Sequence, residues 1–229
     1  MVLLLPHGYD GAGPDHSSAK VERFLQLVDT PGWHPSPSPV PLQTSVNFQV
    51  LNCTTPANYF HALRRQILRP FRKPLVIMAP KTLLRSAHAT SSWSDFQPSS
   101  HFQPLLVPTC TSASAIKRLL FCTGKLYYEL DQLETLSKDD TLVIRIEQLA
   151  PFPFSEMESL LKEQFPNVQQ LAWVQEEPIN QGAWNYIQAH FQHCTSLPLQ
   201  YHGPSALPAS AMGLAPAHQL QKTTYLSLL

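Results

Sequence analysis

The chain has 229 residues, of which 43% are hydrophobic and 14% charged, and its formal net charge is zero. This balance favours neither nucleic acid nor an anionic membrane surface as a partner, while the apolar content suffices for a buried core. No apolar run approaches the roughly 20 residues that a membrane-spanning helix needs, so we expect no membrane span. The four cysteines lack Cys-x-x-Cys spacing, and we expect unpaired thiols in a reducing compartment.

The first segment of the chain predicts a strand, a loop and a helix. Residues 2–5 form a continuous apolar run, which is typical of a strand buried on both faces. After a glycine-rich loop, apolar residues at helical spacing predict a helix over 21–28, with Ser17 or Ser18 as its cap. Residues 30–45 are rich in proline and serine and predict an irregular surface connector.

Two more strands are predicted over 48–51 and 74–78, with a helix between them. Thr55 followed by Pro56 is a favoured helix start, because proline suits the first helical position. The apolar stripe predicted for this helix consists of Tyr59, Phe60, Leu63 and Ile67. Pro70 ends the helix, and the strand–helix–strand alternation predicts a parallel sheet.

The apolar pattern lapses over residues 85–115, which we interpret as a linker between two α/β domains. A second β/α series follows. Its strands are predicted over 119–122, 141–146, 171–174 and 199–201, and its helices over 126–136, 155–164, 184–191 and from 216 onward. Ser155 and Glu158 predict a capping box for the second of these helices, with Phe154 as its hydrophobic staple.

The loop over residues 7–18, with the sequence HGYDGAGPDHSS, is the main candidate for chemistry. Glycine permits unusual backbone conformations, open α/β sheets hold ligands beyond strand ends, and histidine exchanges protons near neutral pH. A dinucleotide-binding fingerprint does not fit, because the third glycine is missing. A serine-hydrolase oxyanion loop does not fit either, because the chain has no G-x-S-x-G elbow. On spacing alone, a structural turn with buried histidines stays open.

Motifs along nearly the whole chain resemble the 2-oxoglutarate dehydrogenase family. The histidine- and glycine-rich loop and the VERFLQ segment over 21–26 are similar to the corresponding segments of that family. Further similar segments follow in the family's order: Thr54–His61, Leu63–Gln66, Phe71–Val76, Ala79–Arg85, Phe121–Tyr128, Arg145–Leu149, Pro151–Pro153, Gln175–Pro178 and Asn180–Trp184. Each segment alone is a weak signal, and their order makes the resemblance strong.

The resemblance implies an α/β, transketolase-like fold. Residues 1–84 would be the carboxy-terminal part of a pyrimidine-binding domain, 85–115 a linker, and 116–229 a complete three-layer carboxy-terminal domain. The implied activity is oxidative decarboxylation of 2-oxoglutarate with thiamine diphosphate and Mg²⁺, in the tricarboxylic acid cycle. The succinyl group would pass to a lipoyl group of the partner transferase, and the complete enzyme would be a homodimer.

Family members carry the diphosphate- and Mg²⁺-binding domain before the region that resembles this chain. We therefore expect a carboxy-terminal fragment that is inactive alone, because the cofactor performs the chemistry and the protein holds it. The resemblance implies the mitochondrial matrix in a eukaryote and the cytoplasm otherwise. Two alternatives stay open: a paralogue acting on 2-oxoadipate, and a non-catalytic truncated remnant that serves as an interaction module.

Four residues carry the site that the resemblance implies. His16 matches the family's active-site histidine, which implies a catalytic role in proton transfer beside a dianionic substrate. His7 lies at the strand exit and is expected to bind substrate or to orient the loop. Arg65 and Thr82 are candidates for the family's allosteric acyl-CoA site, the alternative being a solvated basic rim or interdomain salt bridges.

The remaining charged residues are interpreted more simply. Glu176 and Glu177, after a predicted strand, are expected to be structural carboxylates. Family members usually have arginine after the glycine that corresponds to Gly203, where this chain has Pro204, so any anion contact made there is lost or relocated. No metal site is expected, because the spacing of His190, His193 and Cys194 on one helix is common.

Overall fold

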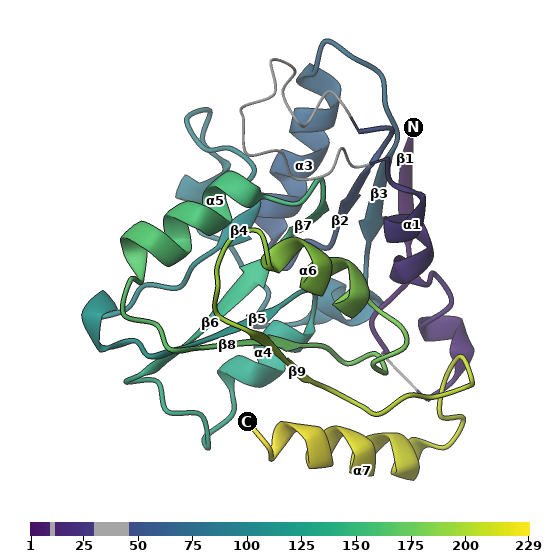
Figure 1. Cartoon of the computed structure of the whole chain (residues 1–229). Coiled ribbons are helices and arrows are strands. Elements are labelled where there is room, and N and C mark those ends of the chain that lie inside the picture. Colours follow the sequence, from purple (N-terminus) through teal and green to yellow (C-terminus); the bar gives the residue numbers. More distant parts are fainter. Residues whose placement is uncertain (10–11, 30–45) are drawn as a thin grey trace.

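The computed structural model describes residues 1–9, 12–29 and 46–229, which form two sheets with helices around them (Figure 1). The first sheet has the strand order β1-β3-β2-β7 and the second β4-β6-β5-β8-β9. The strands are β1 Val2–Leu5, β2 Gln49–Leu51, β3 Leu75–Met78, β4 Leu105–Leu106, β5 Arg118–Cys122, β6 Thr141–Ile146, β7 Gln148–Ala150, β8 Gln170–Val174 and β9 Leu199–His202. The helices are α1 Val21–Leu27, α3 Pro56–Leu68, α4 Leu126–Asp131, α5 Phe154–Ser159, α6 Trp184–Phe191 and α7 Ala215–Leu226.

The pairing is mostly parallel, as the β/α alternation predicts. In the first sheet β3 lies between β1 and β2 and runs parallel to both, while β7 pairs antiparallel with β2. In the second sheet β6, β5, β8 and β9 are parallel, and β4 pairs antiparallel with β6. All strands predicted within the described residues are present, and the predicted α/β class is confirmed. The predicted connector over 30–45 lies outside the described residues.

Alternate residues of each sheet face different helical layers, because side chains of a strand point to opposite faces. Val76 and Met78 of β3 pack into a central core with α1, α5 and α6, while Leu75 and Ile77 face α3. In the second sheet Phe121 packs into the same central core. The opposite face of this sheet packs against α4 and α7. The sheets are thus layered between α3 on one side of the molecule and α4 and α7 on the other (Figure 1).

The carboxyl ends of the parallel strands from both sheets meet. The link is direct, because β7 follows β6 after a single residue, Glu147, and pairs with β2 of the other sheet. The backbone N–H of Asn52 donates to the carbonyl oxygen of Glu147 at 2.9 Å, and Thr54 donates to its carboxylate. His7, just after β1, meets Glu177, just after β8. Ligands of open α/β sheets bind beyond such strand ends. The loop after β1 and the segment after β8 meet at this place and are therefore the candidates for a functional site.

Strand β1 is not buried on both faces, which corrects the expectation from its apolar run. Val2 is 38% exposed and Leu4 is 53% exposed, whereas Leu3 and Leu5 pack against the central core. The reason is position: β1 is an edge strand with β3 as its neighbour in the described part of the sheet. A continuous apolar run does not distinguish an edge strand from a central one.

The predicted cap of α1 is wrong. The residue before the helix is Lys20, in the left-handed conformation with φ 57°, and no side chain caps the helix. Ser17 is buried and its hydroxyl instead donates to the carbonyl oxygen of Ser210 at 3.0 Å. A serine caps a helix only when the backbone places it directly before the first turn. Lys20 occupies that position, and the hydroxyl of Ser17 is engaged with Ser210 instead.

The capping box predicted for α5 is also wrong. The helix begins at Phe154, so Ser155 and Glu158 lie within it, and no side chain caps its start. Phe154 is not a staple outside the helix, because its ring packs edge-on against Phe152 with the centroids 5.0 Å apart. The predicted end is correct, since α5 continues as a π-helical turn that ends at Gln164.

Helix α3 begins as predicted, but its buried face differs in part from the predicted one. Thr55 caps it by accepting a hydrogen bond from the backbone N–H of Asn58 at 3.2 Å, with Pro56 at the first position. Of the predicted stripe, Tyr59 and Leu63 pack against the core, whereas Phe60 is 44% exposed and Ile67 76% exposed, so the stripe is correct only in part. The face that the structure buries consists of Ala57, Asn58, His61 and Ala62. Two polar residues lie on this face because they find partners there.

Two further expectations differ from the structure. Helix α4 ends at Asp131 rather than at residue 136, because Leu136 belongs to a turn that enters the core before β6. The segment 85–115 is not devoid of regular structure, since it contains β4 and the 3₁₀ turns Trp93–Phe96 and Ala113–Ala115. The division into 1–84, 85–115 and 116–229 stays a prediction. Within the described ranges, no helix combines the length and apolarity needed to cross a bilayer.

Candidate functional site

The loop after β1 adopts backbone conformations that most side chains disfavour. Gly8 has φ +130°, and a Cβ atom there would lie 3.0 Å from Cβ of Pro80. Tyr9 and Lys20, with φ 42° and 57°, are non-glycine residues in the left-handed region. Each such residue costs about 1–3 kcal/mol and persists only where surrounding contacts hold it. The loop is therefore held in place by the rest of the molecule.

His7 forms a buried pair with Glu177. Its Nε2 lies 2.7 Å from Oε1 of Glu177, and the two side chains are 2% and 8% exposed. Burial by itself would lower the pKa of His7, but the hydrogen bond and the negative charge of Glu177 outweigh it and raise the pKa. Burial by itself would raise the pKa of Glu177, but the hydrogen bond and charge of His7 lower it. Each member of the pair therefore favours the charged form of the other.

Beside this pair, Glu176 forms a second one with Lys125. The Nζ atom of Lys125 donates to Oε2 of Glu176 at 2.6 Å and lies 3.7 Å from Oε1 of Glu129. Burial, together with the neighbouring charge of Glu177, raises the pKa of Glu176 to about 7, although Lys125 opposes the shift. Of the two consecutive glutamates, one is thus held ionised and the other changes its charge near neutral pH.

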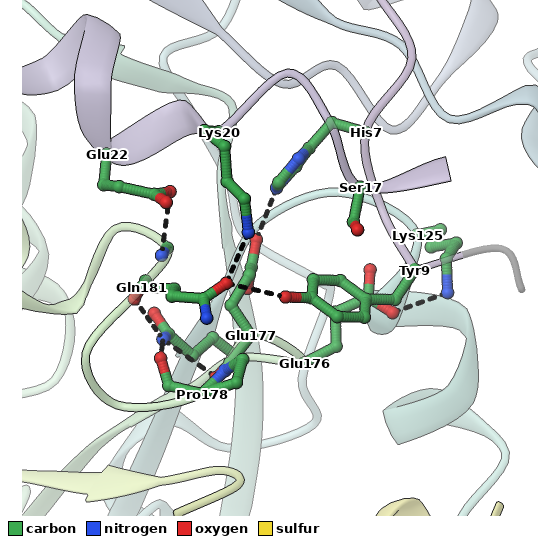
Figure 2. Close-up of polar contacts among 12 residues, drawn as sticks. His7, Tyr9, Ser17, Lys20, Glu22, Lys125, Glu176, Glu177, Pro178 and Gln181 are labelled. Atoms are coloured by element: carbon green, nitrogen blue, oxygen red, sulfur yellow. Dashed lines mark hydrogen bonds and ion pairs between the residues drawn. The ribbon is translucent and has the colours of Figure 1, made fainter. Parts of the chain in front are cut away.

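Gln181 joins the two ends of the loop. Its Oε1 accepts hydrogen bonds from the Tyr9 hydroxyl at 3.0 Å and from Nζ of Lys20 at 2.5 Å. Its Nε2 donates to the carbonyl oxygens of Leu207 at 3.1 Å and Ala209 at 2.9 Å. Figure 2 shows the side chains of Tyr9 and Lys20 converging on this amide, next to the His7–Glu177 pair.

His16 lies on the outer part of the same loop. It ends the 3₁₀ turn Pro14–His16, and its side chain is 32% exposed. Its Nε2 lies 3.1 Å from Oδ2 of Asp15, and its Nδ1 has no hydrogen-bond partner among the described residues. Its side chain is thus far more exposed than that of His7, although in both histidines Nδ1 is a buried atom without a partner among the described residues. A histidine in this position can exchange a proton with a bound molecule.

The structure does not bring Arg65 and Thr82 together in one cavity. Arg65 lines a cavity of about 730 Å³ beside α3, and its guanidinium stacks on the Phe102 ring at 3.9 Å. Burial, with the nearby charge of Arg69, lowers the pKa of Arg65 to about 9. Thr82 is exposed and lines a different cavity of about 390 Å³, together with Tyr9 and other residues. Their joint role in an acyl-CoA site stays a prediction.

Sequence reasoning missed most of the residues that hold the loop. Glu176 and Glu177 were expected to be structural, and their position next to an apolar strand is the signal that their charges would need buried partners. Lys125, Lys20 and Gln181 gave no local signal, because their partners lie far away in the chain. In the described ranges no three His, Cys, Asp or Glu side chains gather as a metal site, and the four cysteines are free thiols.

Comparison with known proteins gives two family matches that together span almost the whole chain. The family description "2-oxoglutarate dehydrogenase C-terminal" matches residues 90–228. The description "Transketolase, pyrimidine binding domain" matches residues 1–87.

Curated relatives match the chain over most of its length. A probable 2-oxoadipate dehydrogenase complex component E1 homolog from Dictyostelium discoideum is 42% identical over 224 residues, which cover 96% of this chain and 25% of the relative. A 2-oxoadipate dehydrogenase complex component E1 from Danio rerio is 42% identical over 99% of this chain and 24% of its own length. A mitochondrial 2-oxoglutarate dehydrogenase from D. discoideum is 43% identical over 99% of this chain and 23% of its own length. The chain thus spans about a quarter of these relatives.

One solved structure, a split-gene transketolase described as an inactive beta4 tetramer, is similar in fold. The TM-score is 0.56 at 13% sequence identity, and the match covers 99% of this chain and 62% of the other. At this identity the likeness concerns the fold alone.

Proposed function

The chain belongs to the 2-oxoglutarate dehydrogenase family, and on this basis we propose that it takes part in thiamine diphosphate-dependent oxidative decarboxylation of a 2-oxo acid. Its contribution is the loop that carries His16 and the second sheet that holds this loop. The observation that carries the proposal is the position of His16. Its side chain is 32% exposed, its Nδ1 atom has no partner among the described residues, and it lies on the loop that follows β1.

The residues of this chain fit the proposed cofactor only in part. The match of residues 1–87 to a pyrimidine-binding domain supports dependence on thiamine diphosphate. The uncommitted Nδ1 atoms of His7 and His16 could face a bound group. No group of three His, Cys, Asp or Glu side chains gathers in the described ranges, so these residues offer no metal site of that kind for Mg²⁺. When bound, the cofactor supplies stabilisation of the carbanion that decarboxylation leaves.

Within this scheme His16 would hold or deliver a proton next to the substrate, and His7 would not act directly. The Nε2 atom of His16 lies 3.1 Å from Oδ2 of Asp15, which orients a ring that is 32% exposed. His7 is enclosed by its pair with Glu177, which supports a loop-orienting role. A positioned acid–base group of this kind contributes roughly 10²–10⁴-fold to the rate.

We favour 2-oxoglutarate as substrate, with transfer of a succinyl group to a lipoyl group of a partner transferase. The identity to relatives named for 2-oxoadipate is 42%, and to one named for 2-oxoglutarate it is 43%, so both substrates have support. The name of the latter relative also supports the mitochondrial matrix as location. A homodimeric enzyme follows from the family resemblance, and a non-catalytic interaction module is the alternative.

A chimera tests the proposal. The matching quarter of the D. discoideum 2-oxoglutarate dehydrogenase is replaced by this chain, and turnover is measured with 2-oxoglutarate and with 2-oxoadipate. We expect activity with 2-oxoglutarate that His16→Ala lowers by roughly 10²–10⁴-fold while the melting temperature is kept. The matched control is His101→Ala, an exposed histidine away from the loop, which should leave turnover unchanged.

Three other results of the chimera experiment would change the proposal. A preference for 2-oxoadipate would move the assignment to the paralogue. A folded chimera that is inactive with both 2-oxo acids would support the interaction module. If His16→Ala unfolds the chimera while the folded fraction keeps its turnover, His16 is a packing residue and its assigned role is wrong.

A further inference from the structure

The histidine loop, defined as residues 7–9 and 12–20, has its strained backbone at two residues near its ends. Tyr9 and Lys20 both adopt left-handed conformations although neither is glycine. Such conformations persist where side-chain contacts over-determine them. Contacts with the rest of the chain must therefore hold these two residues.

Both side chains end on the same atom. The Tyr9 hydroxyl and Nζ of Lys20 donate to Oε1 of Gln181, at 3.0 Å and 2.5 Å (Figure 2). The amide cannot turn to offer its nitrogen, because Nε2 already donates to the carbonyl oxygens of Leu207 and Ala209. Lys20 is only 8% exposed, so its ammonium group depends on this acceptor and on the carbonyl oxygen of Ser210 at 3.4 Å.

The turn that carries Gln181 is itself fixed. The Nε2 atom of Gln175 donates to backbone carbonyl oxygens of Glu177, Pro178 and Gln181 at 3.0, 3.2 and 2.9 Å. Gly182 has φ +71°, and a Cβ atom there would lie 2.8 Å from Nε2 of Gln175. The turn is thus a rigid support, and a rigid support can fix the geometry of a mobile segment.

We propose that Gln181 is a positioning residue, which fixes the histidine loop through Tyr9 and Lys20 and so sets the place of His16. The effect on His16 chemistry rests on the proposed function, whereas the effect on the loop does not. The neighbouring Asn180 provides the contrast, because its amide bonds only to the backbone of Leu207 among the contacts described and does not reach the loop.

Hydrogen exchange in the 229-residue chain tests this inference without any activity. Gln181→Met should speed exchange of the amides of residues 12–20 by roughly tenfold relative to Asn180→Ala, with β5 and β6 unchanged. Tyr9→Phe, which leaves the bonds of Gln181 to Leu207 and Ala209 intact, should give a smaller effect of the same kind. The double variant should be less than additive on a logarithmic scale, because both single changes remove the same hydrogen bond.

A purely structural role for Gln181 in holding residues 207–209 would give additive effects and would overturn the proposal. So would equal loop exchange in Gln181→Met and Asn180→Ala. If Gln181→Met does not fold, Tyr9→Phe alone decides, and unchanged loop exchange in that variant overturns the proposal. In the active chimera, Gln181→Met should lower kcat more than it changes KM. An inactive chimera whose loop nevertheless loosens would contradict the proposed function and leave the positioning role intact.

Discussion

At the scale of single residues, three largely buried ionisable side chains lie beyond the strand ends: His7, Glu177 and Glu176. Their pKa values are shifted in different directions. The raised pKa of His7 stabilises the folded state below its ordinary value of 6.5, and this contribution is lost as the pH rises through the folded value. The lowered pKa of Glu177 contributes above its ordinary value of 4.5 and is lost as the pH falls through the folded value. The pair therefore stabilises the fold most in weakly acidic conditions.

The pKa of Glu176 is shifted in the opposite direction to that of Glu177, which gives a prediction. Its pKa is raised from 4.5 to about 7, so the folded chain retains a proton that the unfolded chain has lost. The stability of the protein should therefore fall as the pH rises between these values. Glu176→Gln removes this dependence, and the variant should gain on the order of 2 kcal/mol over the wild type between about pH 5 and about pH 8.

The measurement is the difference in melting temperature between variant and wild type across this range, in which the titration of other groups cancels. Glu134→Gln is the matched control, since Glu134 is exposed and should give a constant difference. A constant difference for Glu176→Gln as well would mean that Glu176 is fully ionised with Lys125 throughout.

Residue types near strand ends were predictable, but their partners were not. The glycines and histidines after β1 indicated a functional loop because their local chemistry is unusual. Gln181 is an ordinary amide, and its importance depends on Tyr9 and Lys20, which lie 172 and 161 positions away. A contact of that separation leaves no periodic or local signal in the sequence.

At the scale of elements, α3 shows how the start of a helix can be predicted correctly while its buried face is predicted only in part. Its start is encoded locally by Thr55 and Pro56, and the structure confirms it. Its buried face is set by tertiary contacts, since Asn58 bonds to Glu147 at 2.9 Å and His61 to the carbonyl oxygen of Asp95 at 2.8 Å. A periodicity of apolar residues does not register such buried polar partners.

The buried and exposed faces of α3 give a prediction for one position on each. Ala62 is fully buried, and Ala62→Leu should destabilise the protein by about 1–3 kcal/mol because the added atoms have no space. Ile67 is 76% exposed, and Ile67→Ala should change stability by no more than about 0.5 kcal/mol. Urea denaturation of both variants measures the difference. A large loss for Ile67→Ala with a tolerated Ala62→Leu would restore the face predicted from the sequence.

Strand positions were largely predictable, whereas caps and short strands were not. The runs that became β1, β6 and α6 match their predicted bounds, because apolar parallel strands and amphipathic helices are marked by composition and period. Strands β4 and β7 are short and pair antiparallel with strands of the two parallel series. Whether these two segments form strands depends on the strands with which they pair rather than on their own residues.

At the scale of the whole molecule, the two β/α series share one core. The central cluster combines Val50 and Met78 of the first sheet with Ile144 and Trp173 of the second. Strand β7 adds a covalent connection, because it leaves the second sheet at β6 and completes the first at β2. The two β/α series follow one another in the sequence, but they do not form two separate hydrophobic cores.

This shared core predicts the order of hydrogen-exchange protection. The bonded amides of β2, between β3 and β7, should exchange only on global unfolding, at rates similar to those of β5 and β6. Those of β1 should exchange faster, because an edge strand with exposed Val2 and Leu4 can open locally. Exchange measured by mass spectrometry on peptides of the three regions tests this. Equal fast exchange of β1 and β2 would mean that the first sheet opens independently.

The contacts of the histidine loop also have a consequence for the order of assembly. The bonds of His7 to Glu177, of Tyr9 to Gln181 and of Lys20 to Gln181 span 170, 172 and 161 positions. Because closing long stretches of chain costs entropy before their contacts form, such bonds are made late in folding. During synthesis the histidine loop leaves the ribosome before Glu177 and Gln181, which hold it. The loop is thus translated before its support and acquires its shape only after it.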